Sequence, residues 1–159
     1  VKALESENIV KTLEMQGVGV VNSSSEESFT VAKNFKNLEK VSDHIKKIEF
    51  DEAKRQLYMH SEAFNYYAKM WMNIDLLDGE EKKEIRFLVA KGVFSGMNGS
   101  IRFYNFQKVK SRIELLATYN YEKLPIPTFF IEFGLEVVMQ KIAAKMRSFI
   151  EQQKTKEAL

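Results

Sequence analysis

The two prolines of the chain, Pro125 and Pro127, stand immediately before a long segment of helical periodicity. Proline fixes φ and lacks the N–H that a sheet ladder needs, but it is tolerated in the first turn of a helix. The pair therefore predicts a change from strand to helix, with the helix reaching about Gln153. The apolar residues on one face of this segment are Phe129, Phe130, Phe133, Val137, Val138, Ile142, Met146, Phe149 and Ile150. A stripe of this width predicts that the helix lies across a sheet.

Residues 43–124 alternate between apolar and polar with a period of two, which predicts about six antiparallel strands. The clearest alternation is in residues 66–77, whose apolar and polar side chains separate onto opposite faces. Asp78-Gly79 follows this segment and is a strong hairpin signal. Residues 92–99 are rich in glycine and predict a bend or bulge where a curved sheet turns.

The N-terminal part carries weaker signals. Residues 1–14 are charged and weakly periodic, and they predict an arm or a short helix, whereas residues 15–21 predict a first strand. Serines followed by glutamates then predict a helix from about Ser24 to Asn34, because a serine side chain can satisfy the free N–H groups at a helix start. Residues 35–41 predict a second short helical piece. The expected order is strand, two short helices, about six strands and a long helix.

The chain has 159 residues, of which 45% are hydrophobic, and this is enough for one compact domain without a metal or disulfide. We expect a single domain at residues 15–153, an arm at 1–14 and a tail at 154–159. The chain has no cysteine, which excludes disulfides, zinc–thiolate sites and cysteine nucleophiles. The compartment stays open between cytoplasm and periplasm, the latter if a leader preceded Val1.

The charges are balanced. The 24 basic and 22 acidic residues are interspersed and leave a net charge of +2, which does not make the concentrated basic face of a nucleic-acid binder. We therefore expect no nucleic-acid partner. The sequence has no metal-ligand cluster or nucleotide-binding glycine loop, so we also expect no cofactor. A transient contact with a membrane or a protein stays open, as does the oligomeric state.

Three segments carry a resemblance. Val18–Phe50 resembles the opening of START-like (SRPBCC, helix-grip) domains, in which a first strand is followed by a small helix pair and a return strand. Residues 92–103, beginning Gly92-Val-Phe-Ser-Gly-Met-Asn-Gly99, are similar to the bend and penultimate strand of the polyketide cyclase/dehydrase and coenzyme Q-binding branch. Leu124-Pro-Ile-Pro-Thr-Phe-Phe130 and the following helix resemble the terminal helix of that branch. The resemblance covers about residues 15–153.

The resemblance implies an α+β helix-grip fold, with a curved antiparallel sheet of about six or seven strands wrapped around the C-terminal helix. It also implies a cavity between sheet and helix for a hydrophobic or amphipathic small molecule. The residues predicted on the inner faces are Met59, Met70, Met72, Phe87, Phe103, Leu115, Tyr119, Phe130, Phe133 and Val137. A lining rich in methionine adapts to irregular ligands, but the same residues can also form a packed core.

Polar candidates are few. His60, beside Ser61 and Glu62, is a candidate for acid–base catalysis, although its alternation with Met59 predicts that it faces solvent. A further polar set on the last two strands could orient a ligand: Arg102, Tyr104, Asn105, Tyr119 and Tyr121. The alternative is that Arg102 pairs with an acidic neighbour and that the tyrosines lie at the sheet edge.

These observations favour binding or transport of a lipid-, quinone- or polyketide-like small molecule without catalysis. Two other functions stay open. One is a cyclase, dehydrase or hydrolase that uses the same cavity, with His60 or a tyrosine as acid or base. The other is a module that binds ribosomes or proteins, as in the ribosome-associated toxin relatives, and the balanced charge argues against it.

Overall fold

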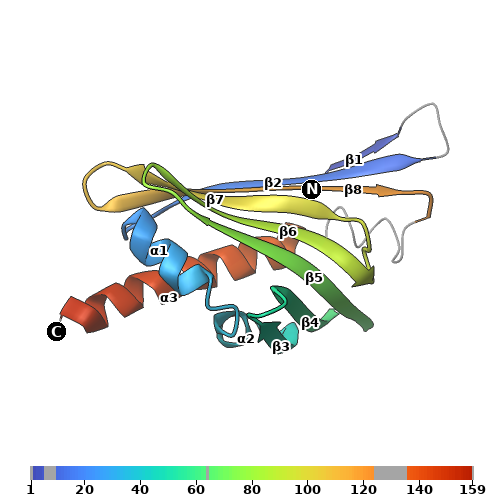
Figure 1. Ribbon diagram of the computed structural model, residues 1–159, viewed down its shortest axis with the longest axis horizontal. Helices are drawn as coiled ribbons and strands as arrows, with labels where there is room; N and C mark the ends of the chain where they lie inside the picture. Colours follow the sequence, from blue (N-terminus) through green and yellow to red (C-terminus); the bar gives the residue numbers. More distant parts are fainter. Residues whose placement is uncertain (1, 6–9, 64, 124–135, 159) are drawn as a thin grey trace.

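The computed structural model describes residues 2–5, 10–63, 65–123 and 136–158. One antiparallel sheet carries three helices on one of its sides (Figure 1). Its strands are β1 (Lys2–Glu5), β2 (Lys11–Val21), β3 (Ile45–Asp51), β4 (Gln56–Ala63), β5 (Tyr66–Asp78), β6 (Lys82–Gly92), β7 (Asn98–Phe106) and β8 (Lys110–Tyr121). The helices are α1 (Ser25–Ala32), α2 (Asn37–Val41) and α3 (Glu136–Ala158). None of the described helices is long and apolar enough to cross a membrane.

The strand order is β1-β2-β8-β7-β6-β5-β4-β3 in an 8-stranded sheet, and every neighbouring pair is antiparallel. The expected fold class is confirmed: a curved antiparallel sheet lies against a long C-terminal helix, and two short helices follow β2. The six strands expected after these helices are β3 to β8. The sheet is wider than the six or seven strands expected because β1 adds a strand beside β2.

The first residues are strand, so the expectation of a short helix before residue 15 is wrong. Residues 2–5 form β1, and β2 begins at Lys11 and pairs with β8 along its whole length. The physical reason is that neighbouring side chains of this segment alternate between buried and solvated positions, which is the pattern of a β-strand. Leu13 is fully buried in the core, whereas Thr12 lies on the opposite face and donates from Oγ1 to Asn120 Oδ1 at 2.8 Å. The charged residues nearby conceal this alternation in the sequence.

The first short helix lies where the serine and glutamate pattern predicts it, and the second lies within the predicted residues 35–41. The Ser24 side chain caps α1 by accepting a hydrogen bond from the Glu27 backbone N–H at 3.1 Å. The cap positions Phe29, whose ring meets that of Phe103 edge to face at a centroid distance of 5.5 Å. Ser28 and Ser111, both buried, share a hydrogen bond of 2.9 Å. These contacts fix α1 on the sheet near the ends of β7 and β8.

The glycine-rich segment forms the expected bend. The register of β5 against β6 shifts between Trp71 and Met72, and β6 ends at Gly92 with a φ of +97°. The turn that follows carries Phe94 and Met97 back over the concave face of the sheet, where both side chains are buried. Phe94 itself has a positive φ of 63°, a backbone conformation that an aromatic residue seldom adopts.

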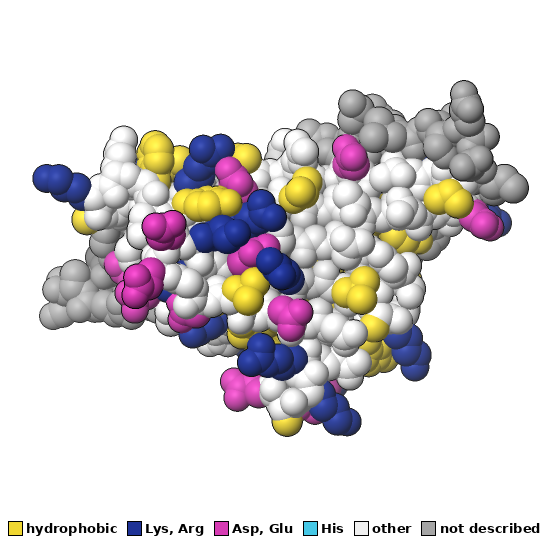
Figure 2. Space-filling model, turned by 45° about the horizontal axis from the view of Figure 1, so that its top comes forward, with side chains coloured by type: hydrophobic (Ala, Val, Ile, Leu, Met, Phe, Trp, Pro, Cys, Tyr) yellow, Lys and Arg dark blue, Asp and Glu magenta, His cyan; other side chains and the backbone are white. Residues whose placement is uncertain are grey.

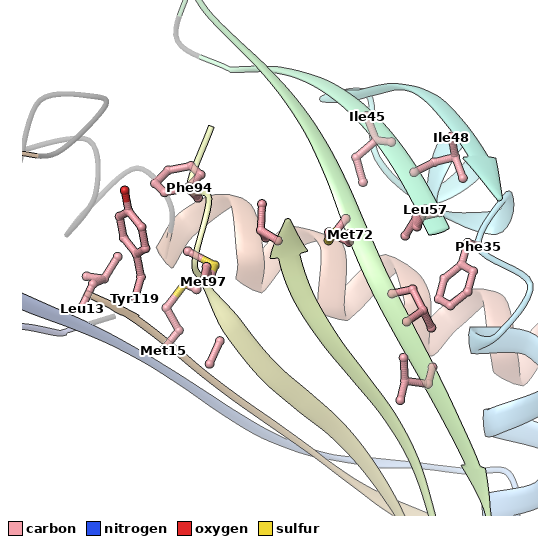
Figure 3. Close-up of a cluster of buried hydrophobic side chains, with 14 of the residues drawn as sticks. Leu13, Met15, Phe35, Ile45, Ile48, Leu57, Met72, Phe94, Met97 and Tyr119 are labelled. Carbon is pink, nitrogen blue, oxygen red and sulfur yellow. The ribbon is translucent and has the colours of Figure 1, made fainter. Parts of the chain in front are cut away.

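The core lies between the concave face of the sheet and the helices (Figure 3). Two ends can be distinguished in it. One end holds Leu13, Met15, Phe94, Met97 and Tyr119, and the other holds Phe35, Ile45, Ile48 and Leu57. Met72 lies between these two groups in the close-up.

Candidate functional site

The strand pairing places six of the predicted ligand-binding residues on the concave face: Met59, Met70, Met72, Phe87, Phe103 and Tyr119. They differ in burial. Phe103, Met72 and Tyr119 are buried in the core cluster, whereas the other three are half-buried and pack against it. Phe130 and Phe133 lie outside the described residues. Val137 belongs to α3, but its side chain is also outside the part that is described.

Several apolar residues in the middle of the concave face are only half-buried, although α3 lies on this side of the sheet (Figure 1). The half-buried apolar residues of this face are Met59, Met70, Phe87, Ile101, Ile113 and Leu115. Two apolar residues of α3, Ile142 and Met146, are half-buried in the same way. Close-packed interiors leave such side chains almost no accessible surface, so these residues are less completely packed than the buried core.

Two glycines of β2 leave room on the same face of the sheet. Gly17 and Gly19 have the same parity along β2 as Leu13 and Met15, so side chains at these positions would project from the concave face. A Cβ at Gly19 would meet no atom within 4 Å, and one at Gly17 would only touch Leu115 Cβ at 3.8 Å. The sheet therefore lacks two side chains in a place where there is room for them.

An aromatic group lines one end of the concave face. Tyr119 and Tyr121 stack with a centroid distance of 5.6 Å and an interplanar angle of 20°, and Phe94 meets Tyr119 edge to face at 5.5 Å. Burial raises the pKa of Tyr119, and the neighbouring Tyr121 raises it further, so the hydroxyl keeps its proton at neutral pH. A protonated phenol can donate a hydrogen bond.

Sequence reasoning missed part of this end. Phe94 and Met97 lie in the segment whose sequence predicts a bend. The local sequence does not predict that the turn places their side chains in the core. The alternation along β2 could have identified Leu13 and Met15 as core residues, but Leu13 lies in the segment that the sequence predicts as an N-terminal arm or short helix.

His60 lies on the opposite, convex face, as its alternation with Met59 predicts. Its Nε2 is 3.4 Å from Glu62 Oε1, a contact that becomes an ion pair only when the imidazole is protonated. Its ring centroid is 6.2 Å from that of Tyr67, which is strongly exposed. This placement separates His60 from the concave residues by the thickness of the sheet and argues against a catalytic role for it there.

The convex face carries a cluster of charges around Glu84, whose side chain is only 1% exposed. Its Oε1 accepts hydrogen bonds from Arg86 Nε at 3.2 Å and from Arg102 Nε at 3.4 Å, and Lys82 Nζ is 3.7 Å from Oε2. Burial alone would raise the pKa of Glu84, but Arg86, Arg102 and Lys82 outweigh it and hold the pKa below its ordinary value. The interpretation in which Arg102 pairs with an acidic neighbour is therefore correct.

Replacing Glu84 with glutamine should destabilise the protein by about 1–2 kcal/mol near neutral pH, because the cations lose their counter-charge but stay partly solvated. The pKa of Glu84 is lower in the folded state than in the unfolded state. Its contribution is therefore complete above the ordinary value of 4.5 and is lost as the pH falls through the lowered one. The stability difference between wild type and Glu84→Gln, measured by urea denaturation, should shrink in acid.

A matched control is Glu49→Gln, because Glu49 pairs with Lys47 at 3.0 Å but is well exposed. Exposed pairs contribute little, so this variant should lose less than about 1 kcal/mol. An equal loss in both variants would contradict the role assigned to the burial of Glu84.

Two hollows lie elsewhere on the surface. One, of about 410 Å³, is on the convex face and is lined by Glu84, Arg86, Phe87, Asn98, Gly99, Ser100, Arg102, Leu116, Ala117 and Thr118. The other, also of about 410 Å³, lies between α2 and α3 and is lined by Lys40, Val41, Ala144, Lys145, Ser148, Phe149 and Gln152. Figure 2 shows Lys and Arg side chains lying among acidic and hydrophobic ones over the visible face, without forming one basic field.

No protein-family profile matches the chain, and no curated protein matches it either. Solved structures do match its fold. A START superfamily protein from Mycobacterium smegmatis has a TM-score of 0.70 and 14% identity, covering 88% of this chain and 98% of that chain. The Zhui aromatase/cyclase from Streptomyces sp. R1128 has a TM-score of 0.68 and 12% identity, covering 89% of this chain and 95% of that chain.

A third similar structure is norcoclaurine synthase from Thalictrum flavum in complex with dopamine and hydroxybenzaldehyde. It has a TM-score of 0.62 and 16% identity, covering 90% of this chain and 88% of that chain. All three alignments include the greater part of both chains, and their identities are too low to carry more than architecture. Together with the curved sheet and the long C-terminal helix, they show that the chain has the START-like, helix-grip fold.

Proposed function

We propose that the protein binds a hydrophobic or amphipathic small molecule between the concave face of the sheet and α3, and that it carries this molecule without changing it chemically. The observation that carries the proposal is the incomplete burial of apolar side chains on both walls. Met70, Phe87 and Leu115 on the sheet, and Ile142 and Met146 on the helix, are all only half-buried.

The chemical character of these walls supports an apolar ligand. Methionine side chains are unbranched and polarisable, so Met59, Met70 and Met72 can adapt to an irregular shape. An apolar pocket that buries most of a small molecule gains affinity from the area removed from water. The START superfamily protein and the aromatase/cyclase have a similar fold, and the second of them acts on a small molecule as its name says.

The polar groups near the concave face do not favour catalysis. Within the described residues, no group of three or more His, Cys, Asp or Glu side chains could hold a metal ion. His60 lies on the other face, and burial raises the pKa of Tyr119, so its phenol keeps its proton near neutral pH and is not available as a base. These groups favour a binding role over the cyclase or dehydrase alternative.

A matched pair of tryptophan substitutions tests the proposal. Leu115 and Leu116 are neighbours on β8, but Leu115 lies half-buried on the concave face and Leu116 is exposed on the convex face. Leu115→Trp should narrow the space and weaken binding of a neutral naphthylamine dye at least tenfold, a change of about 1.4 kcal/mol. Leu116→Trp should leave the dye affinity unchanged. The measurement is a fluorescence titration, with thermal denaturation of each variant as a check on folding.

Equal affinities for both variants would contradict the assignment of the site to the concave face. Catalysis has a separate test. Incubation of the wild-type protein with a dye-displacing ligand, followed by mass spectrometry, should return that ligand unchanged, and a new product would favour the enzymatic alternative.

A further inference from the structure

The strand β3 lies at one end of the strand order, so one of its edges has none of the described strands beside it. Backbone N–H and C=O groups on an open edge can pair with another chain, and folded proteins usually block such edges. Here α2 lies next to β3 (Figure 1). A register shift between Ile45 and Lys47 makes one end of the strand irregular, which leaves residues 47–51 as its regular part.

A side chain of α2 occupies this edge. Glu39 Oε1 accepts a hydrogen bond from the Ile48 backbone N–H at 2.6 Å and another from Lys36 Nζ at 3.1 Å. The Ile48 N–H therefore points toward α2 and away from β4. The hydrogen bond from Ile48, and after it the one from Lys36, holds the pKa of Glu39 below its ordinary value, so the carboxylate is charged at neutral pH. A charged acceptor thus takes the place that the C=O of a neighbouring strand would have.

The sequence of β3 is complementary to itself in one antiparallel register. In that register Ile48 lies opposite Ile48 of a second copy, and the two residues exchange N–H···O=C hydrogen bonds. Lys47 then lies opposite Glu49 of the second copy, and Glu49 lies opposite its Lys47. Both side chains lie on the convex face and are more than half exposed, at 56% and 60%. The four charges would therefore alternate in sign across the pair.

Other registers are less favourable. A shift of the second copy by two residues keeps the hydrogen-bonding pattern, but it places Lys47 opposite Lys47 or Glu49 opposite Glu49. Like charges directly opposite each other destabilise a pair of strands. A shift by one residue places the buried face of one strand beside the solvated face of the other. The charge pattern therefore favours a single register with a second copy of the same strand.

We propose that the edge of β3 is a pairing site for a second copy of this chain, and that Glu39 keeps this edge closed by occupying the Ile48 N–H. When the edge is open, a two-fold pairing centred on Ile48 joins the sheets of the two copies into one. The inference goes beyond the proposed function and is independent of it, because the outer edge of β3 is not part of the concave binding site.

Removal of the acceptor tests the role of Glu39. In sedimentation velocity at neutral pH, Glu39→Ala should pass from monomer to dimer as the concentration rises, with a dissociation constant about tenfold or more below that of wild type. Glu39→Leu should do the same, because leucine is a good helix former that cannot accept a hydrogen bond. Lys36→Ala is the matched control. It removes the ion pair at 3.1 Å but leaves the carboxylate on Ile48, so it should behave as wild type.

Charge reversal tests the register. In the Glu39→Ala protein, adding Lys47→Glu places acidic side chains opposite each other and should suppress the dimer. Adding Glu49→Lys as well restores opposite charges and should restore the dimer. Thermal denaturation of each variant checks that it is folded. If the folded Glu39 variants stay monomeric, or if wild type or Lys36→Ala dimerises as strongly as they do, the role of Glu39 is overturned. Equal dimerisation of all the charge variants overturns the pairing centred on Ile48.

Discussion

Gly92→Ala is expected to destabilise the protein by about 3 kcal/mol, as the sum of a backbone term and a steric term. Gly92 has a φ of +97°, which an L-residue adopts only at a cost of about 1–2 kcal/mol. In addition, an added Cβ would collide with the carbonyl oxygen of Lys69 on the neighbouring strand β5. Backbone atoms cannot move aside as a flexible side chain can, so the bend between β6 and β7 must distort. Urea denaturation measures the loss.

Gly96→Ala is the control for the backbone term alone. Gly96 also has a φ of +97°, but a Cβ there would meet nothing within 4 Å. This variant should lose only about 1–2 kcal/mol, the cost of the left-handed conformation. The steric argument would be refuted if both variants lost the same stability.

Phe103→Ala is expected to cost about 3–5 kcal/mol, the range for truncating a buried phenylalanine. Phe103 is 1% exposed, and its ring packs edge to face against Phe29. Truncating the Phe103 side chain leaves a cavity where α1 contacts the sheet, and it also removes the interaction between the two rings. The sequence predicts Phe103 as a ligand-binding residue, and the structure places it in the buried core against Phe29 of α1. Thermal and urea denaturation should both report the loss.

Phe106→Ala provides the comparison on the same strand, because Phe106 is 38% exposed. It should lose less than half as much stability as Phe103→Ala. If Phe103→Ala were as stable as wild type and only weakened dye binding, Phe103 would be a wall of the binding space and not a part of the core.

The sequence predicts the sheet well where one face is solvated. In β5, Met72 and Ile74 are buried while Asn73 is exposed, so a period of two is visible without any knowledge of the partners. The same rule fails for Glu84. Its alternation places it on the convex face, but Lys82 and Arg86 of its own strand and Arg102 of β7 surround the carboxylate, and the contact with Arg102 depends on the strand pairing.

The proposed binding site is predicted less completely than the fold. Period and composition place Met70 and Phe87 on the concave face, but they do not say how far α3 stands from that face. Whether Leu115 is packed or half-free depends on this distance and on the missing side chains of Gly17 and Gly19. Phe94 reaches the site only because the turn after Gly92 reverses the chain, a tertiary effect that the local sequence does not encode.

The pairing of β2 with β8 joins residues that are about a hundred positions apart, for example Met15 and Ala117. A ribosome adds residues from the N-terminus, so β2 leaves the exit tunnel long before its partner exists. During that interval only β1 can pair with it, and its other edge exposes unpaired N–H and C=O groups. Contacts of such long range slow folding. We therefore expect the nascent chain to depend on chaperones until β8 has been synthesised, and to gain protease resistance abruptly when residues 110–121 emerge.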